Sequence, residues 1–211
     1  GYFVVDGKEK LIIPQEKFAD NMLYIRDKVD DKYSHSAEIR SVSDDASKPK
    51  RKLAVKIVSS TPTLKNGQIV VQIPNVRKPI PLFIVMRALG VVADKEIIEH
   101  CVLNMENHKN ILALFTPSVY DSGRIFNQLD ALKFIGSFTK GKTIPHVKEI
   151  LMDYFLPHIG ELNFKAKALY LGYIVLRLFK VYNKEEEPTD RDSFKFKRVE
   201  VTGSLLRDLF N

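Results

Sequence analysis

Apolar and polar positions alternate in the first third of the chain, which is the period of half-buried β-strands. The alternation is clearest at residues 53–57 and 69–73, and an Asn-Gly pair stands between them at 66–67. Because this dipeptide accepts positive φ at low cost, the pattern predicts a β-hairpin. The charged segment 44–52 has no apolar period, so we expect an exposed loop there.

A second hairpin is predicted at the start of the chain. Two short apolar runs, 2–5 and 10–13, flank Asp6 and Gly7, which form another dipeptide suited to a tight turn. The first part of the sequence therefore predicts β-structure.

From Pro81 onward the period becomes helical. Apolar stripes at 97–102, 129–135 and 144–154 predict successive helices, with Asp94 as N-cap of the first. A short helix is predicted near 205–210. The fold class is therefore α+β, with a β-rich first third followed by a helical remainder.

The longest helix is predicted from a stripe with spacings of four and three residues. These positions share one helix face, and they are Leu162, Ala166, Leu169, Tyr173 and Leu176. This pattern predicts Leu169 at the centre of the helical core and Lys167 on the solvent side.

Composition adds that this is an ordinary globular chain of 211 residues, 45 % of them hydrophobic, with a net charge of +7. The first 80 residues hold 15 Lys and Arg against 10 Asp and Glu, so most of the excess lies there. No apolar run reaches the roughly 18 to 20 residues that cross a bilayer, and the one cysteine, Cys101, suits a reducing compartment. We expect an intracellular protein with no membrane partner, whose two ends interrupt patterns that continue in a longer chain.

Two terminal motifs carry the most specific signal. Residues 1–16 read GYFVVDGKEKLIIPQE and residues 190–206 read DRDSFKFKRVEVTGSLL. Both resemble signatures of the second-largest subunit of multisubunit DNA-directed RNA polymerases of the eukaryotic type, relatives of bacterial beta. Internal segments at 34–41, 79–90 and 155–159 follow in that family's order. The resemblance covers the whole chain and points to the lobe domain with its flanks.

The chain also departs from the family pattern. The usual Asn-Gly is Asp6-Gly7, the arginine after Gln-Glu is Lys17, and Ser204 stands where a proline is usual. These departures indicate a divergent copy, from a large DNA virus or an outlying eukaryote.

The resemblance implies a function in transcription. It implies a non-catalytic wall of the downstream DNA cleft within a nucleotidyltransferase, with other polymerase subunits, initiation factors and duplex DNA as partners. It implies Mg²⁺ in the parent enzyme but no cofactor in this segment, and a location in the nucleus, a viral factory or a virion. It divides the chain into a β-rich part with flanking strands (1–80), a helical part (81–187) and the start of the connection to the fork (188–211).

One motif offers an alternative function. Residues 136–143, GSFTKGKT, satisfy the P-loop pattern, in which main-chain N–H groups cradle phosphates and the lysine reaches the β and γ phosphates. A P-loop needs a buried strand before it, whereas the preceding stripe is helical. A small P-loop nucleotide-binding protein and a free-standing basic α+β adaptor are therefore the competing hypotheses.

Other candidates for chemistry are weaker. Asp190 and Asp192 lack further oxygen ligands, so we expect one to cap a short helix and the other to pair with a neighbouring cation. Without a Cys-x-x-Cys pair we expect no metal site, and we assign no catalytic residue. The candidates for contacts to the DNA backbone are Lys50, Arg51, Lys52, Lys140 and Lys142.

Overall fold

The computed structural model describes residues 2–45, 47–60, 66–103 and 109–210, which form two compact units. The larger unit, unit 2, spans Asn21–Thr189, and the smaller, unit 1, combines Gly1–Asp20 with Asp190–Asn211. The larger unit ends two residues after the predicted division at 187. The change from strand to helix at Pro81 lies inside unit 2, because sheet and helices share one core there.

Unit 2 contains an antiparallel sheet with its strands in the order β4-β5-β6-β7-β8. Their bounds are Leu23–Asp27, Tyr33–Ser41, Arg51–Val58, Ile69–Gln72 and Ile80–Pro81. Leu53, Val55 and Ile57 are buried as predicted, although Ala54 between them is buried as well, and Ile57 pairs with Ile69 in the β6–β7 hairpin. The predicted exposed loop ends earlier than expected, because Arg51 and Lys52 already belong to β6.

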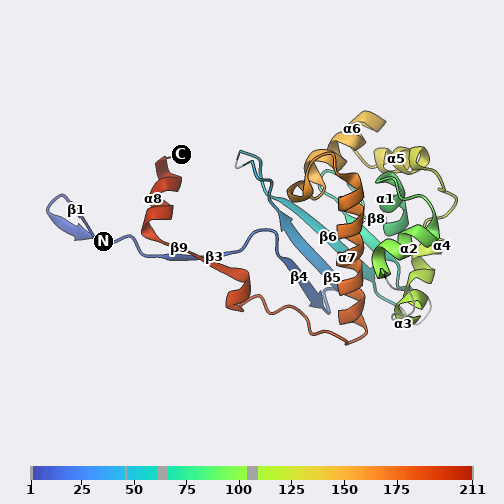
Figure 1. The fold of residues 1–211 in the computed structure, drawn as a ribbon, viewed down its shortest axis with the longest axis horizontal. Coiled ribbons are helices and arrows are strands. Elements are labelled where there is room, and N and C mark those ends of the chain that lie inside the picture. Colours follow the sequence, from blue (N-terminus) through green and yellow to red (C-terminus); the bar gives the residue numbers. More distant parts are fainter. Residues whose placement is uncertain (1, 46, 61–65, 104–108, 211) are drawn as a thin grey trace. The chain divides into compact units, whose positions relative to one another are not determined.

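Helices cover one face of this sheet, and the longest, α7, crosses β4 and β5 (Figure 1). The helical segments are α1 (Leu82–Ala88), α2 (Asp94–Val102), α3 (Lys109–Leu112), η1 (Ala113–Phe115), α4 (Thr116–Asp121), α5 (Gln128–Ser137), α6 (Ile144–Glu149), the π-helical turn η2 (Ile150–Tyr154), η3 (Pro157–Ile159) and α7 (Phe164–Tyr182). The apolar faces of the helices and the inner face of the sheet form one continuous core.

The start of α2 differs from its prediction. Ala93 occupies the N-cap position, and Asp94 is the first helical residue. The Asp94 carboxylate instead pairs with Arg87, a buried side chain on α1 that also donates to the main-chain oxygens of Val92 and Ile125. A buried guanidinium needs these acceptors, so Asp94 stabilises the Arg87 charge.

The buried face of α7 also differs from its prediction. Leu169 and Tyr173 are 40 % and 42 % exposed, whereas Lys167 is fully buried. The core face is the one that carries Ala168, Leu171, Val175 and Leu178. The helix has two apolar faces, and the sequence pattern identified the outer one.

Unit 1 confirms the first hairpin and the closing helix. Strands β1 (Phe3–Val5) and β2 (Lys8–Lys10) pair around Asp6 and Gly7, both with positive φ. Strand β3 (Gln15–Phe18) pairs with β9 (Lys197–Glu200), so segments from both ends of the chain form one ladder. The remaining elements are η4 (Phe194–Phe196) and α8 (Thr202–Phe210).

Candidate nucleic-acid interface

The outer face of the sheet is charged because strand residues alternate between faces. Lys52 and Glu38 point to this face, and Lys52 Nζ lies 3.0 Å from Glu38 Oε2. Arg26, from β4, approaches the same carboxylate oxygen at 3.2 Å. Glu38 therefore partly neutralises the charge of Lys52, which the sequence analysis proposed as a contact to the DNA backbone.

Arg51 points to the opposite face from Lys52, since the two are neighbours in β6. Its guanidinium carbon lies 4.0 Å from the centre of the Tyr154 ring, in a cation–π contact. Lys50 precedes the strand and is exposed. The basic run at 50–52 thus divides into an exposed lysine, a stacked arginine and a paired lysine.

A turn between β7 and β8 brings a second basic group close. The Arg77 main-chain N–H donates to Phe138 O at 3.0 Å, which ties this turn to the end of α5. Lys78 Nζ lies 5.5 Å from the Phe138 ring centre, and Asn75 has φ of 64°. The link sets Arg77 and Lys78 beside the loop that carries Lys140.

Two adjoining hollows follow this link and share Asn75 and Val76 in their walls. One, of about 380 Å³, is lined by Lys50, Arg51, Lys52, Ala54, Gln72 and Ile73–Val76. The other, of about 340 Å³, is lined by Asn75, Val76, Arg77, Lys140 and His146. We call the two hollows together the basic groove. Among the described residues that line it there is no Asp or Glu, so it favours a polyanion.

The structure thus brings Lys50, Lys52 and Lys140 to one groove. Lys142 is exposed in the same loop as Lys140 but does not line the groove. Arg77 and Lys78 were missed by the sequence analysis, because each cluster was sought as a run in sequence. The signal that could have found them is the charged turn at 74–79, which contains two prolines and directly follows a predicted strand.

The segment 136–143 does not adopt P-loop geometry. It follows helix α5 rather than a strand, and Gly136 is the penultimate residue of that helix. Thr139 is buried: its hydroxyl donates to Gly136 O at 2.9 Å and accepts from the Lys142 N–H at 3.2 Å. The main-chain groups therefore close a helix end instead of cradling phosphate.

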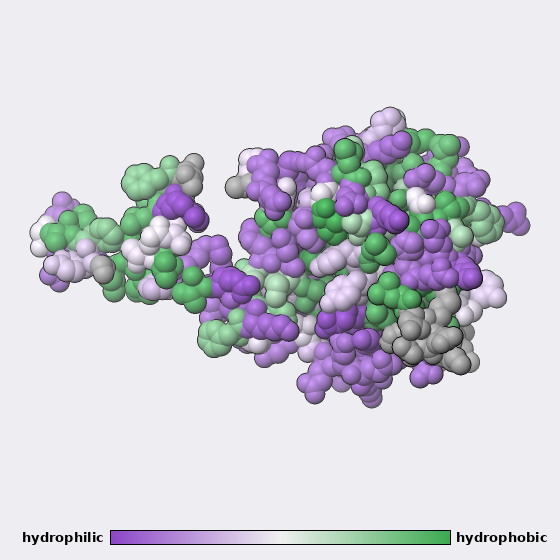
Figure 2. Space-filling view, viewed as in Figure 1, coloured by the Kyte–Doolittle hydropathy of each residue, from purple (hydrophilic) through white to green (hydrophobic). Residues whose placement is uncertain are grey.

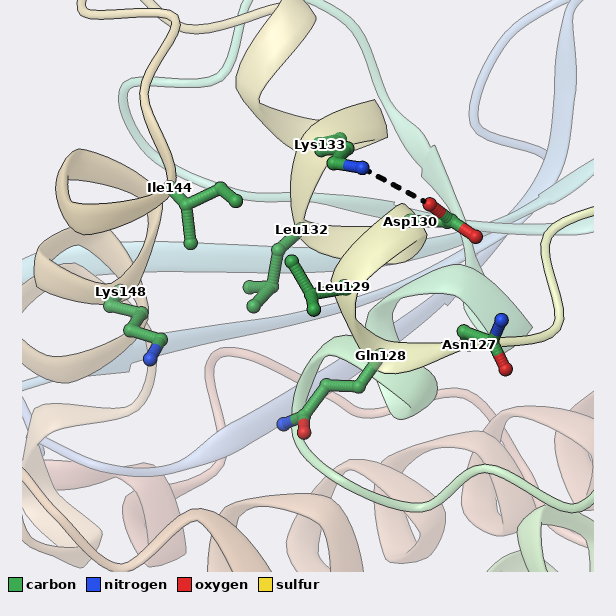
Figure 3. Close-up of a pocket in the computed structure, with 8 residues that line it drawn as sticks. All are labelled: Asn127, Gln128, Leu129, Asp130, Leu132, Lys133, Ile144 and Lys148. Carbon is green, nitrogen blue, oxygen red and sulfur yellow. Dashed lines mark ion pairs between the residues drawn. The ribbon is translucent and has the colours of Figure 1, made fainter.

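A further hollow of about 700 Å³ lies between α5 and α6. In Figure 3, Leu129 and Leu132 from α5 and Ile144 from α6 converge on it, with Lys148 at its edge. Lys133 pairs with Asp130 at 3.6 Å. Leu129 is 58 % exposed, so this member of the predicted α5 stripe lies outside the core. Its apolar floor suits a polyanion poorly.

The two aspartates near the C-terminus have a local role. Asp190 Oδ1 accepts from the Asp192 N–H at 2.9 Å, which closes a small turn. The predicted cap is wrong, since Ser193 precedes η4 and makes no side-chain cap. Lys197, one of the cations proposed as a partner, pairs with Glu16 at 2.7 Å. In the part of the chain that the structure describes, no three His, Cys, Asp or Glu side chains come close enough to hold a metal ion.

None of the described helices is both long enough and apolar enough to span a bilayer.

Fold and groove together define an α+β domain that presents a basic surface. Residues 26–200 match the family described as RNA polymerase Rpb2, domain 2, and the chain belongs to this family.

Among its relatives, the DNA-directed RNA polymerase II subunit RPB2 of Encephalitozoon cuniculi is 37 % identical over 219 residues. The DNA-directed RNA polymerase II subunit 2 of Arabidopsis thaliana is 36 % identical, and the DNA-directed RNA polymerase subunit Rpo2 of Saccharolobus solfataricus is 33 % identical. Each comparison covers 100 % of this chain but only 18 or 19 % of the relative. The chain therefore spans about a fifth of the length of these relatives.

Proposed function

We propose that this chain is the lobe of a second-largest RNA polymerase subunit and contributes one wall of the downstream DNA cleft. In this role it is a non-catalytic part of a nucleotidyltransferase, and the Mg²⁺ of the parent enzyme is bound elsewhere. Small polymerase subunits and initiation factors are its protein partners, and its location is that of its polymerase, in the nucleus or a viral factory. Family membership argues against a nucleotide-binding protein or an adaptor unrelated to transcription.

The observation that carries the DNA-facing part is the basic groove. Lys50, Arg77 and Lys140 are exposed, and the groove that they line contains no described carboxylate. Such an arrangement binds phosphates without reading bases, which suits a duplex that must slide past. Three to four phosphate contacts imply a log–log salt slope of about −3 to −4 and a Kd on the order of 10⁻⁴ to 10⁻⁶ M.

The test is fluorescence anisotropy with two duplexes of unrelated sequence across a salt series. The variant Lys50→Ala/Arg77→Ala/Lys140→Ala should flatten the slope by roughly one unit for each phosphate that is no longer bound, equally for both duplexes. A matched variant, Lys95→Ala/Arg124→Ala/Lys133→Ala, removes the same charge from exposed sites outside the groove. Equal salt slopes for the two triple variants would contradict DNA binding at the groove. They would show that duplex binding depends on net charge alone.

A further inference from the structure

His146, in helix α6, lines the basic groove together with Arg77 and Lys140 but has no part in the phosphate contacts proposed above. Its side chain is 33 % exposed, so a ligand in the groove can reach it. Histidine is the side chain whose charge ordinarily changes between pH 5 and 8. Among the described residues that line the groove it is the one of this kind, whereas the lysines and arginines stay charged.

Two contacts set the orientation of the His146 ring. Nδ1 lies 3.4 Å from Glu149 Oε2, one helical turn further along α6. The opposite edge of the ring packs directly on Gly141, since a Cβ added there would lie only 2.8 Å from His146 Cδ2. Gly141 follows Lys140 in the loop before α6, so the absence of a side chain at this position lets the ring lie beside that lysine.

The contact with Glu149 decides which ring nitrogen of His146 carries the hydrogen in the neutral form. A carboxylate only accepts, so Nδ1 must donate, and a neutral ring then has no hydrogen on Nε2. Nε2 is accessible, and no described residue is hydrogen-bonded to it. A phosphate oxygen of the DNA backbone also only accepts. Nε2 can therefore bind a phosphate only when the ring is protonated on both nitrogens.

We propose that His146 is a proton-dependent phosphate ligand of the basic groove, so that a duplex binding there takes up a proton from solvent at this ring. The charged groups that face the ring are Arg77 from the β7–β8 turn, Lys140 from the preceding loop and Glu149 from α6 itself. A phosphate drawn in by the two cations adds the nearby negative charge that favours the protonated ring. This inference rests on the proposed function, because it requires a duplex in the groove.

The experiment measures duplex binding by fluorescence anisotropy at pH 8.0 and pH 6.0, for the 211-residue chain and two glutamine variants. For the unsubstituted chain we expect binding about tenfold tighter at pH 6.0, with a salt slope steeper by about 0.9 because one more phosphate is bound. His146→Gln should lose most of this gain. The control, His100→Gln, removes a histidine of α2 that does not line the groove, and it should keep the gain.

The control is needed because histidines outside the groove also gain charge as pH falls. Figure 2 shows hydrophilic side chains, in purple, over much of the visible surface of unit 2, so attraction to DNA is not confined to one place. Thermal melts at both pH values check that the three proteins are folded. An equal gain in all three, or no gain in the unsubstituted chain, would overturn this inference and leave the proposed function standing. Absence of duplex binding at both pH values would overturn the proposed function and this inference with it.

Discussion

Lys167 Nζ donates a 2.8 Å hydrogen bond to the main-chain oxygen of Leu151. A second bond of the same length reaches Met152 O, so one buried ammonium serves two carbonyls of the π-helical turn η2. Burial lowers the pKa of Lys167 to about 8, while Asp153 and Glu161 act in the opposite direction. The contact joins α7 to η2 through a side chain that the sequence pattern assigned to solvent.

The first prediction concerns this lysine. Lys167→Ala leaves two carbonyl oxygens without their donor, so we expect the free energy of unfolding to fall by roughly 2–4 kcal/mol. Lys165→Ala, at an exposed position of the same helix, should change it by less than about 0.5 kcal/mol. Urea denaturation of both variants measures the difference. Equal midpoints would show that Lys167 is not needed at η2.

The second prediction concerns pH. His158 Nδ1 lies 2.7 Å from Ser41 Oγ, which also accepts the His158 main-chain N–H at 3.2 Å. The serine proton is thus available to Nδ1, which must be unprotonated to accept it. Burial and the nearby Lys167 both lower the pKa of His158, whereas Asp44 raises it.

Because the folded-state pKa is lowered, the unfolded chain takes up a proton first as pH falls through about 6.5. The stabilisation is complete above that pH and is lost progressively below it, down to the folded-state pKa. His158→Asn keeps an acceptor for Ser41 but does not titrate. Urea melts at pH 7.5 and 5.0 should show a larger loss for the unsubstituted chain. His35, whose pKa burial also lowers, stays in both proteins and cancels in the comparison.

The third prediction concerns the contact between α2 and α7. A Cβ added at Gly172 would lie 2.8 Å from the carbonyl carbon of His100, closer than real side chains approach. Gly172→Ala should therefore destabilise the chain by roughly 1–3 kcal/mol, although alanine favours helix. Gly203, in α8, has open space around it, so Gly203→Ala should be neutral or slightly stabilising. Thermal melts of the two variants test the packing; a stabilised Gly172→Ala would refute it.

The fourth prediction concerns Glu38. Replacing it with glutamine frees Lys52 and Arg26 from their shared carboxylate, so the basic groove gains an available cation. We expect tighter duplex binding and a salt slope steeper by about 0.9 if one more phosphate is bound. Glu187→Gln makes the same change of charge at an exposed position outside the groove. If both variants bind alike, Glu38 does not limit Lys52.

The sequence predicted strands better than helix faces, and the reason is physical. Leu53, Val55 and Ile57 lie on the face of β6 that packs on the core, and their spacing of two residues identified that face correctly. In α7 both faces carry apolar residues. The true core face contains Lys167, whose charge is matched by carbonyls about 15 residues away in sequence, and no local pattern reveals such a partner.

Only part of the candidate site could be predicted from the sequence, and the reason is similar. Lys50 and Lys52 could be proposed as a run, but the run could not show that Arg51 would turn to Tyr154 or that Glu38 would pair with Lys52. Arg77 reaches the groove from a turn whose main chain is hydrogen-bonded to Phe138, far away in sequence. Contacts between distant segments decide which cations can bind phosphate. The positions of these cations in the sequence do not reveal those contacts.

The pairing of Thr189 with Ile25 also bears on how such a domain evolves. The beginning and the end of unit 2 lie beside each other, as in many inserted domains. The flanking chain is therefore joined to the unit at two closely spaced points. Exposed loops and helix ends in unit 2 can then change in length without moving the flanking chain. The surfaces of this unit can therefore diverge in sequence, while the ladder between β3 and β9 holds the two flanking segments together.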